Sequence, residues 1–150
     1  MRINTIKYYT IYRPPLTLAS AAAETIQSFL RDTNTKPSDY DLILTGDLGK
    51  VGSQLLVDLL KKDFGIDISA VHNDCGLMIY DLENQDMHAG GSGCGCSASV
   101  VNSHIMKRLE SKQLNSVLFV GTGALLSPTS SLQGESVPGI AHGVLLTSGE

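Results

Sequence analysis

The stretch DLILTGDLGKVGSQLLVDLLKKDFG, residues 41–65, decides the fold because it joins a buried strand to an amphipathic helix. Residues 41–45 form a short apolar run between polar turns, which is typical of a strand buried on both faces. Leucines then recur at helical spacing over 54–63, and Gly65 follows as a signal for the helix end. The stretch therefore predicts a strand, a turn and a helix, the unit from which α/β layers are built.

The same alternation of hydrophobic patterns runs through the rest of the chain. Further elements are predicted at 19–33 (helix), 77–80 (strand), 97–111 (helix), 115–120 (strand) and 140–147 (strand). Two polar loops, 81–96 and 127–139, separate them. Before the first helix, Pro14 and Pro15 interrupt a β-prone run, so this opening is predicted to be a loosely held arm or an edge strand. We expect an α/β fold with a mixed sheet and helices on both faces.

Composition excludes several classes of partner. The net charge is −4 and the basic residues form no patch, whereas nucleic-acid sites gather lysine and arginine. No apolar run approaches the roughly 20 residues that a membrane-spanning helix needs. Three cysteines without a secretion signal indicate reduced thiols. We expect no nucleic-acid partner and no direct membrane span.

The stretch HAGGSGCGCSAS, residues 88–99, is the most informative candidate for a binding site. Its glycines permit positive φ and close approach of another group. They lead into a predicted helix N-terminus, where free amides and the helix dipole favour an anion. The alternative is a packing site, in which small residues let the helix lie close to a sheet. Taken alone, the pattern favours packing, since neither nucleotide-binding glycine spacing is present.

Cysteine and histidine residues offer weaker candidates. A metal site would collect His72, Cys75, His88, Cys94 and Cys96, but the paired spacing of structural zinc sites is absent. Cys94 or Cys96 near a helix N-terminus could be an activated nucleophile, although small buried thiols are commoner. We expect no metal and no cofactor.

Asp47 and His142 each allow two interpretations. Asp47 follows a buried strand at its carboxyl end, where α/β sheets place functional groups. It could equally be a solvated turn residue that bonds its own backbone. His142 could be a general base, but a core histidine whose ring nitrogens are hydrogen-bonded is the commoner case. His104 lies in a predicted helix and is interpreted as a structural residue.

Five stretches in this order carry a resemblance to a known family: DLILTGDLGKVGS, HNDCGLMIY, AGGSGCGCSA, TGALLSP and GIAHGV. They resemble the C-terminal half of the stage V sporulation protein AD (SpoVAD) family, within the thiolase superfamily. The resemblance covers residues 19–150, and residues 1–18 do not match. It implies one half of a five-layer fold whose active site lies between two similar halves. It also implies that the helix near Ser97 is the most buried one, and that a large apolar face is left uncovered.

Departures from the superfamily pattern imply that this chain is not an enzyme. The histidine of the ketosynthase branch falls on Gly46, and its asparagine falls near Cys94. The second cysteine of thiolases falls on Val120 or Gly121. The nucleophilic cysteine belongs to the other half, and acyl transfer needs both nucleophile and base.

The resemblance implies a binding role instead. The ligand would be dipicolinate (pyridine-2,6-dicarboxylate), with or without calcium, and the partners other spore dipicolinate-channel proteins. A complementary N-terminal half or a second copy would complete the fold, in the cytoplasm or peripheral to the forespore or spore inner membrane. Whether the chain is a native short protein, a truncation or a gene remnant stays open. The alternative function is an acyltransferase or ketosynthase-like subunit whose partner supplies the nucleophile. The expected ligand-binding residues are Gly46, Asp47, Gly91, Ser92, Gly93, Cys94, Gly95 and Cys96.

Overall fold

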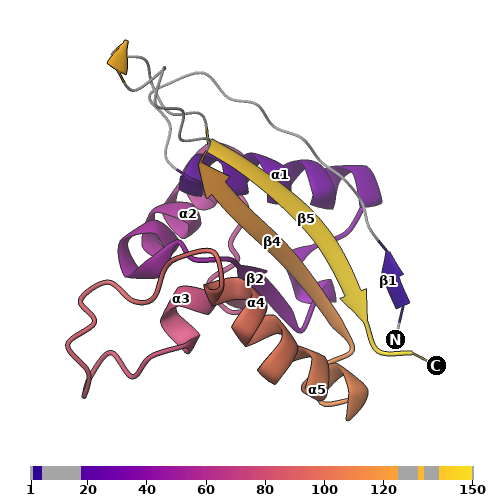
Figure 1. Cartoon of the computed structure of the whole chain (residues 1–150). Coiled ribbons are helices and arrows are strands. Elements are labelled where there is room, and N and C mark those ends of the chain that lie inside the picture. The colour runs from indigo at the N-terminus through magenta and orange to yellow at the C-terminus, as the bar shows by residue number, and fades with distance from the viewer. Residues whose placement is uncertain (1, 5–17, 125–131, 134–138, 150) are drawn as a thin grey trace.

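A mixed five-stranded sheet forms the centre of the molecule, with the strand order β1-β5-β4-β2-β3. The computed structural model describes residues 2–4, 18–124, 132–133 and 139–149. The strands are β1 (Arg2–Asn4), β2 (Leu42–Thr45), β3 (His72–Asp74), β4 (Ser116–Ala124) and β5 (Gly139–Thr147). Strand β2 is parallel to β3 and β4, whereas β5 is antiparallel to β4 and β1. Figure 1 shows the long β4–β5 pair crossing the molecule.

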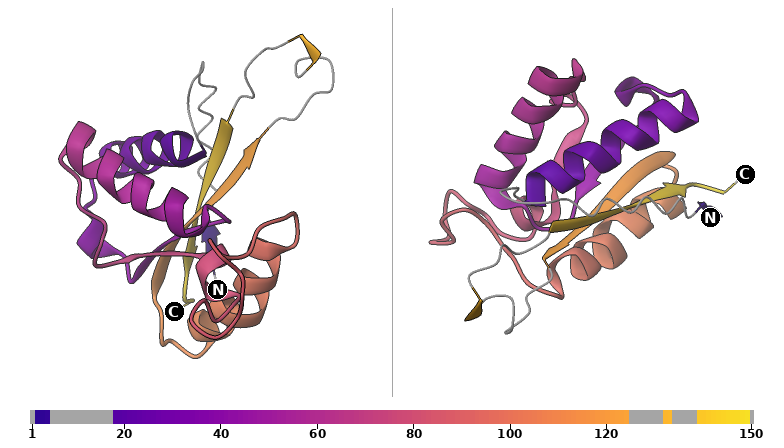
Figure 2. Two further views of the ribbon diagram at one scale, coloured as in Figure 1. Left: turned by 90° about the vertical axis from the view of Figure 1, so that its left-hand side faces the viewer. Right: turned by 90° about the horizontal axis from the view of Figure 1, so that it is seen from above.

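Helices cover both faces of this sheet, which confirms the predicted α/β class. They are α1 (Leu18–Thr33), α2 (Gly49–Phe64), α3 (Cys75–Met78), α4 (Cys96–Val100), a π-helical turn (Val101–Ile105) and α5 (Met106–Glu110). A short 3-10 helix (Pro37–Asp39) precedes β2. The last three helical pieces follow one another without a break and are called helical segment 96–110 below. Figure 2 shows α1 and α2 on one side of the sheet and helical segment 96–110 on the other.

Helix α1 is the most buried helix because its alanines let it lie close to the sheet. Ala19, Ala22 and Ala23 are almost fully buried, and Ile26 and Phe29 are completely so. These side chains share one core cluster with residues of α2, β2, β4 and β5. The helix covers the sheet so closely because small side chains shorten the distance at which helix and strands can pack.

Helical segment 96–110 buries only one stripe, so the expectation that it is the most buried helix is wrong. Val100, Ile105 and Leu109 pack on the sheet in a second core cluster. Its opposite side carries exposed small and polar residues, among them Ala98 and Ser99. A single sheet covers one side of a helix, and among the described residues no second layer lies over the other side.

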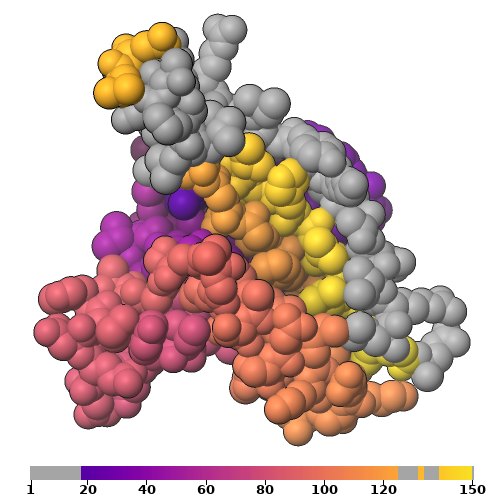
Figure 3. Space-filling view, viewed as in Figure 1, coloured from indigo at the N-terminus to yellow at the C-terminus, as the bar shows by residue number. Residues whose placement is uncertain are grey.

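The large uncovered apolar face implied by the resemblance stays a prediction, although strongly exposed large hydrophobic side chains are few among the described residues. The exposed large hydrophobic side chains there are Val51, Phe64, Ile79, Tyr80 and Leu132. Only Ile79 and Tyr80 line hollows beside helical segment 96–110. Figure 3 shows this side of the molecule, where β4 and β5 remain visible beyond the helical segment.

The prediction of a strand at 77–80 is wrong, because the first half of this stretch belongs to helix α3. The strand lies earlier, at His72–Asp74. The side chain of Asp74 then accepts a hydrogen bond from the Gly76 amide and caps α3. Capping favours helical geometry for the apolar residues that follow. Other boundaries differ by a few residues: α2 already begins at Gly49, and β4 continues to Ala124.

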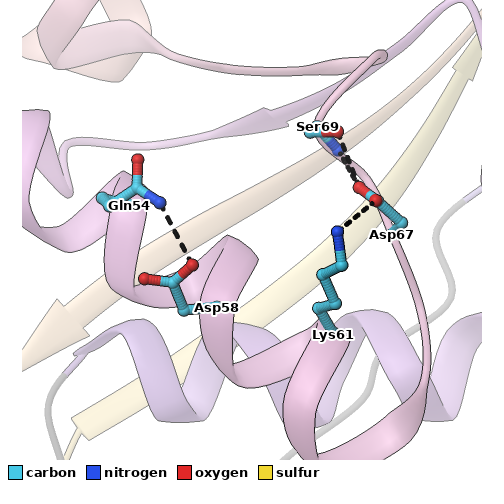
Figure 4. A network of polar contacts seen from close by, with 5 residues as sticks. All are labelled: Gln54, Asp58, Lys61, Asp67 and Ser69. Atoms are coloured by element: carbon cyan, nitrogen blue, oxygen red, sulfur yellow. Dashed lines mark hydrogen bonds and ion pairs between the residues drawn. The ribbon is translucent and has the colours of Figure 1, made fainter.

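Polar contacts fix the connection from α2 to β3, as Figure 4 shows. Gly65 takes a left-handed conformation (φ 67°) and ends α2, with its amide donating to the Leu60 carbonyl. Asp67 then accepts hydrogen bonds from the hydroxyl and amide of Ser69 and pairs with Lys61 at 3.1 Å. These donors, Ser69 first, lower the pKa of Asp67 to about 2. These exposed polar contacts flank Ile68, whose completely buried side chain anchors the turn in the core.

Candidate functional site

The candidate site lies where the turn after β2 meets the glycine-rich loop and the carboxyl end of β4. Gly46 is buried, and its amide donates to the Val120 carbonyl at 3.1 Å. A Cβ at Gly46 would come within 3.3 Å of the Thr122 amide and hydroxyl. The absence of a side chain at this position therefore lets the β2 turn lie directly on β4.

Asp47 connects the three segments. One carboxylate oxygen accepts hydrogen bonds from the Ser92 hydroxyl (3.0 Å) and the Gly93 amide (3.1 Å). The other accepts from the Thr122 hydroxyl at 3.3 Å. Asp47, which is expected to share a ligand site with the glycine-rich loop, contacts that loop directly. The interpretation of Asp47 as a turn residue that bonds its own backbone does not describe its contacts. The Gly93 amide, however, already has a partner in this arrangement.

A hollow of about 340 Å³ opens beside this junction. Six of the eight predicted site residues line it, together with Ile79, Tyr80 and Ser99: Gly91, Ser92, Gly93, Cys94, Gly95 and Cys96. Gly46 and Asp47 do not line the hollow, although Asp47 holds two residues of its wall. A second hollow of about 350 Å³ shares Ile79 and Ser99 and continues along helical segment 96–110.

The glycines of the loop divide into two groups. Gly90 and Gly91 are packing glycines, since a Cβ at either would collide with a neighbour, the Gly76 carbonyl for Gly90 and Ile79 for Gly91. Gly93 and Gly95 instead face open space, and Gly93 takes a positive φ of 117°. The packing interpretation therefore holds for the first part of the loop. The second part is free to contact another molecule.

Asp74 is the residue of this region that sequence reasoning missed. Its carboxylate is completely buried and accepts four hydrogen bonds from neutral donors. An aspartate between a strand and a glycine two residues later is a recognisable helix cap. The donors from the β2 turn come from residues far away in the sequence, so that pattern alone does not reveal them.

Two thiols of this region, Cys75 and Cys96, have pKa values above the ordinary value of a cysteine. Burial, followed by the nearby Asp74 carboxylate, raises the pKa of Cys75 to about 12. Burial and the Asp47 carboxylate raise the pKa of Cys96. Since a nucleophilic cysteine needs a lowered pKa, Cys96 is not activated in this arrangement. Cys94 is exposed on the wall of the hollow.

The histidines do not come together with the cysteines. His72 bridges Ile43 and Ser53 by its two ring nitrogens, and burial lowers its pKa. Within the part of the chain that the structure describes, no group of His, Cys, Asp and Glu side chains could hold a metal ion. His142 is exposed and lines a third hollow of about 310 Å³ at the carboxyl end of β4. The interpretation of His142 as a core histidine is therefore wrong. His104 is exposed as well and borders the second hollow.

None of the helices among the described residues is both long enough and apolar enough to cross a membrane.

Comparison with known proteins connects this geometry to one family. Residues 15–147 match the family described as "Stage V sporulation protein AD (SpoVAD)". Stage V sporulation protein AD of Bacillus subtilis (strain 168) is 54% identical over 128 residues, which make up 85% of this chain and 37% of that protein. The chain thus spans little more than a third of the length of this relative.

Proposed function

Because the chain belongs to the stage V sporulation protein AD family, we propose that it is a non-catalytic, dipicolinate-binding protein of spore formation. It acts with other proteins of the spore dipicolinate channel, peripheral to the membrane. A second chain, either a complementary half or another copy, completes its binding site. The observation that carries the proposal is the hollow beside Asp47, whose wall is the exposed part of the glycine-rich loop.

The chemistry of the wall suits a flat dicarboxylate. In residues 91–96 the amides of Gly91, Gly93 and Cys96 and the Ser92 hydroxyl already have acceptors within the chain. The amides of Ser92, Cys94 and Gly95 are the donors that remain for a ligand, and no side chain of this stretch is charged. Successive backbone amides in a glycine-rich turn are donors that carboxylates use. Tyr80 and Ile79, which also line the hollow, give the pyridine ring an apolar surface. The volume of about 340 Å³ lies in the range of small-molecule sites.

Calcium has a defined part in this proposal. Asp47 already accepts three hydrogen bonds and would repel a bare dianion that approached the loop. Calcium prefers carboxylate, carbonyl and hydroxyl oxygens, and it could bridge Asp47 to a ligand carboxylate. Dipicolinate should therefore bind more tightly with calcium than without it.

The non-catalytic part of the proposal rests on the thiols. Acyl transfer through a cysteine needs a thiolate and a neighbouring base. The raised pKa values of Cys75 and Cys96 oppose this role. We expect no thiolase or ketosynthase turnover with acetyl-CoA or acyl-carrier-protein substrates. Turnover above background that a Cys94→Ala substitution abolishes would instead favour the acyltransferase-like subunit.

Two valine variants test the binding site in a matched way. Gly93 and Gly65 both have positive φ, +117° and +67°, and a Cβ would meet open space at either position. Both substitutions strain the backbone, Gly93→Val more strongly because +117° lies outside the left-handed region that other residues can reach. Only Gly93 lines the hollow. We expect dipicolinate with calcium to bind the chain with an affinity on the order of millimolar, because one wall is present. Gly93→Val should weaken binding several-fold in a titration followed by amide resonances, while Gly65→Val should not.

The titration has two outcomes that would overturn the proposal. If dipicolinate up to tens of millimolar, about ten times the expected dissociation constant, moves no resonance of residues 91–96, the chain does not bind it at this loop. If the folded Gly93→Val variant binds as the parent does, the loop is a packing element and not part of the site.

A further inference from the structure

We propose that Asp74 is a positioning residue for this site: its buried carboxylate holds the β2 turn and the glycine-rich loop at the spacing that Asp47 requires. The inference rests on the proposed function, which gives the site its ligand. It concerns a residue that does not line the hollow and that would act through Asp47.

The contacts of Asp74 divide between its two oxygens. One oxygen accepts from the Thr45 hydroxyl (2.6 Å) and the Leu48 amide (2.9 Å). The other accepts from the amides of Gly49 (3.0 Å) and Gly76 (2.9 Å). No cation is among these partners, so the carboxylate is stabilised by neutral donors alone. A buried carboxylate held in this way is sensitive to the loss of any donor.

These contacts place Asp74 at both sides of the Asp47 junction. Leu48 and Gly49 directly follow Asp47, so their amides fix the turn that carries it. On the other side, the Gly76 carbonyl accepts a hydrogen bond from the Gly91 amide at 2.7 Å. The next residues of that loop, Ser92 and Gly93, are the donors to Asp47. Asp74 thus lies between the two backbone segments whose separation sets the Asp47 contacts.

An Asp74→Asn substitution keeps the size of the side chain and removes half of its accepting capacity. If the new amide group replaces the oxygen facing Gly49 and Gly76, both amides lose their acceptor. If it replaces the other oxygen, the Thr45 hydroxyl can rotate to accept from it, and the Leu48 amide loses its acceptor. Either arrangement loosens a segment that positions Asp47.

The matched control is Asp41→Asn. Asp41 directly precedes the first residue of β2, at the end of the strand away from Asp47. There, one of its oxygens accepts from the amides of Asn115 (2.6 Å) and Ser116 (3.0 Å). This substitution also weakens bonds between a carboxylate and backbone amides, but far from the hollow. Because Asp41 is exposed and the remaining oxygen of Asn can still accept from both amides, this variant controls for the loss of a carboxylate charge next to β2, and the free energy of unfolding of Asp74→Asn is measured separately by urea titration.

The experiment records amide resonances of the whole chain and its affinity for dipicolinate with calcium. We expect Asp74→Asn to shift the Ser92 and Gly93 resonances and to reduce affinity about tenfold, because the loosened segments must be realigned on binding at a cost on the scale of one buried hydrogen bond. Asp41→Asn should do neither. In an Asp47→Asn background, Asp74→Asn should have little further effect on affinity, since it acts through Asp47.

Each remaining outcome decides the question. Unchanged Ser92 and Gly93 resonances in a folded Asp74→Asn variant, or fully additive losses of affinity in the double variant, would refute the positioning role. If the parent chain binds no dipicolinate, the proposed function fails, and the resonances still decide the role of Asp74. If Asp74→Asn does not fold, Thr45→Val removes a single donor to the same carboxylate, and the same shifts are expected from it.

Discussion

The two ends of α2 offer a matched test of how tightly the glycine-rich loop is held. Gly49 and Gly65 have nearly the same backbone conformation, with φ of +65° and +67°. A Cβ at Gly65 would meet nothing within 4 Å, whereas a Cβ at Gly49 would lie 2.6 Å from the Ala89 carbonyl oxygen. That carbonyl also accepts a hydrogen bond from the Lys50 amide at 2.7 Å. The two alanine variants therefore differ in one collision.

The magnitude follows from these contacts. Left-handed backbone costs an alanine about 1–2 kcal/mol, and the stiffer unfolded chain offsets about 0.4–1 kcal/mol. Gly65→Ala should therefore lower the free energy of unfolding by about 1 kcal/mol. Gly49→Ala adds about 1–3 kcal/mol for the collision and about 0.5–1.5 kcal/mol for the strained Lys50–Ala89 bond. Its total cost should be about 3–5 kcal/mol.

Urea unfolding followed by circular dichroism measures both variants against the parent chain. The difference between them, rather than either value alone, tests the reasoning, because it cancels the cost of positive φ. Equal losses within about 0.5 kcal/mol would mean that the loop yields at Ala89 without cost. The tight packing described for the first part of the loop would then be refuted.

Three further predictions concern groups in and around the core. Because burial lowers the pKa of His72 below its ordinary value of 6.5, the unfolded chain binds more protons, so stability should fall as pH drops through and below about 6.5. His72→Gln should make the free energy of unfolding, measured by urea titration at several pH values, less dependent on pH. An unchanged pH dependence would refute the role of His72. Iodoacetamide at pH 8 should label Cys94 in the native protein and leave Cys75 unmodified until unfolding, which mass spectrometry checks. Phe29→Ala should cost about 3–5 kcal/mol because Phe29 is completely buried; a loss under about 1 kcal/mol would show that the core refills the space.

Periodicity alone predicted most of the fold. The leucine stripe of α2 and the helical spacing of apolar residues in α1 predicted helices, and the apolar runs of β2, β4 and β5, bounded by turns, predicted strands. The failure at 77–80 has a physical cause, since four apolar residues suit a strand or a buried helix equally. The hydrogen bond that the Asp74 carboxylate accepts from the Gly76 amide settles the choice in favour of a helix. The π-helical turn at Val101–Ile105 has no signal in the residue pattern.

The candidate site was predictable where it depends on chain direction. Asp47 directly follows the carboxyl end of β2, and the chain leaves the parallel strand β3 at the same edge of the sheet before it reaches residues 91–96 through helix α3. The Thr122 contact was not predictable, because it depends on β2 and β4 being neighbours. The role of Asp74 was hidden for the same reason, since the amides of Leu48 and Gly49 reach it only after β2 and β3 have paired.

The pairing of β1 with β5 has a mechanical consequence. Arg2 lies opposite Thr147 in an antiparallel pair, and Thr147 lies opposite Ser116 in the next one; Figure 1 shows the two ends of the chain side by side. A force that pulls the ends apart would therefore load the hydrogen bonds of β1 and β5 one after another, beginning at Arg2 and Thr147, instead of all at once. The sheet should peel open from this edge under a small force, and the β2–β3 edge beside Asp47 should be the last part of it to come apart.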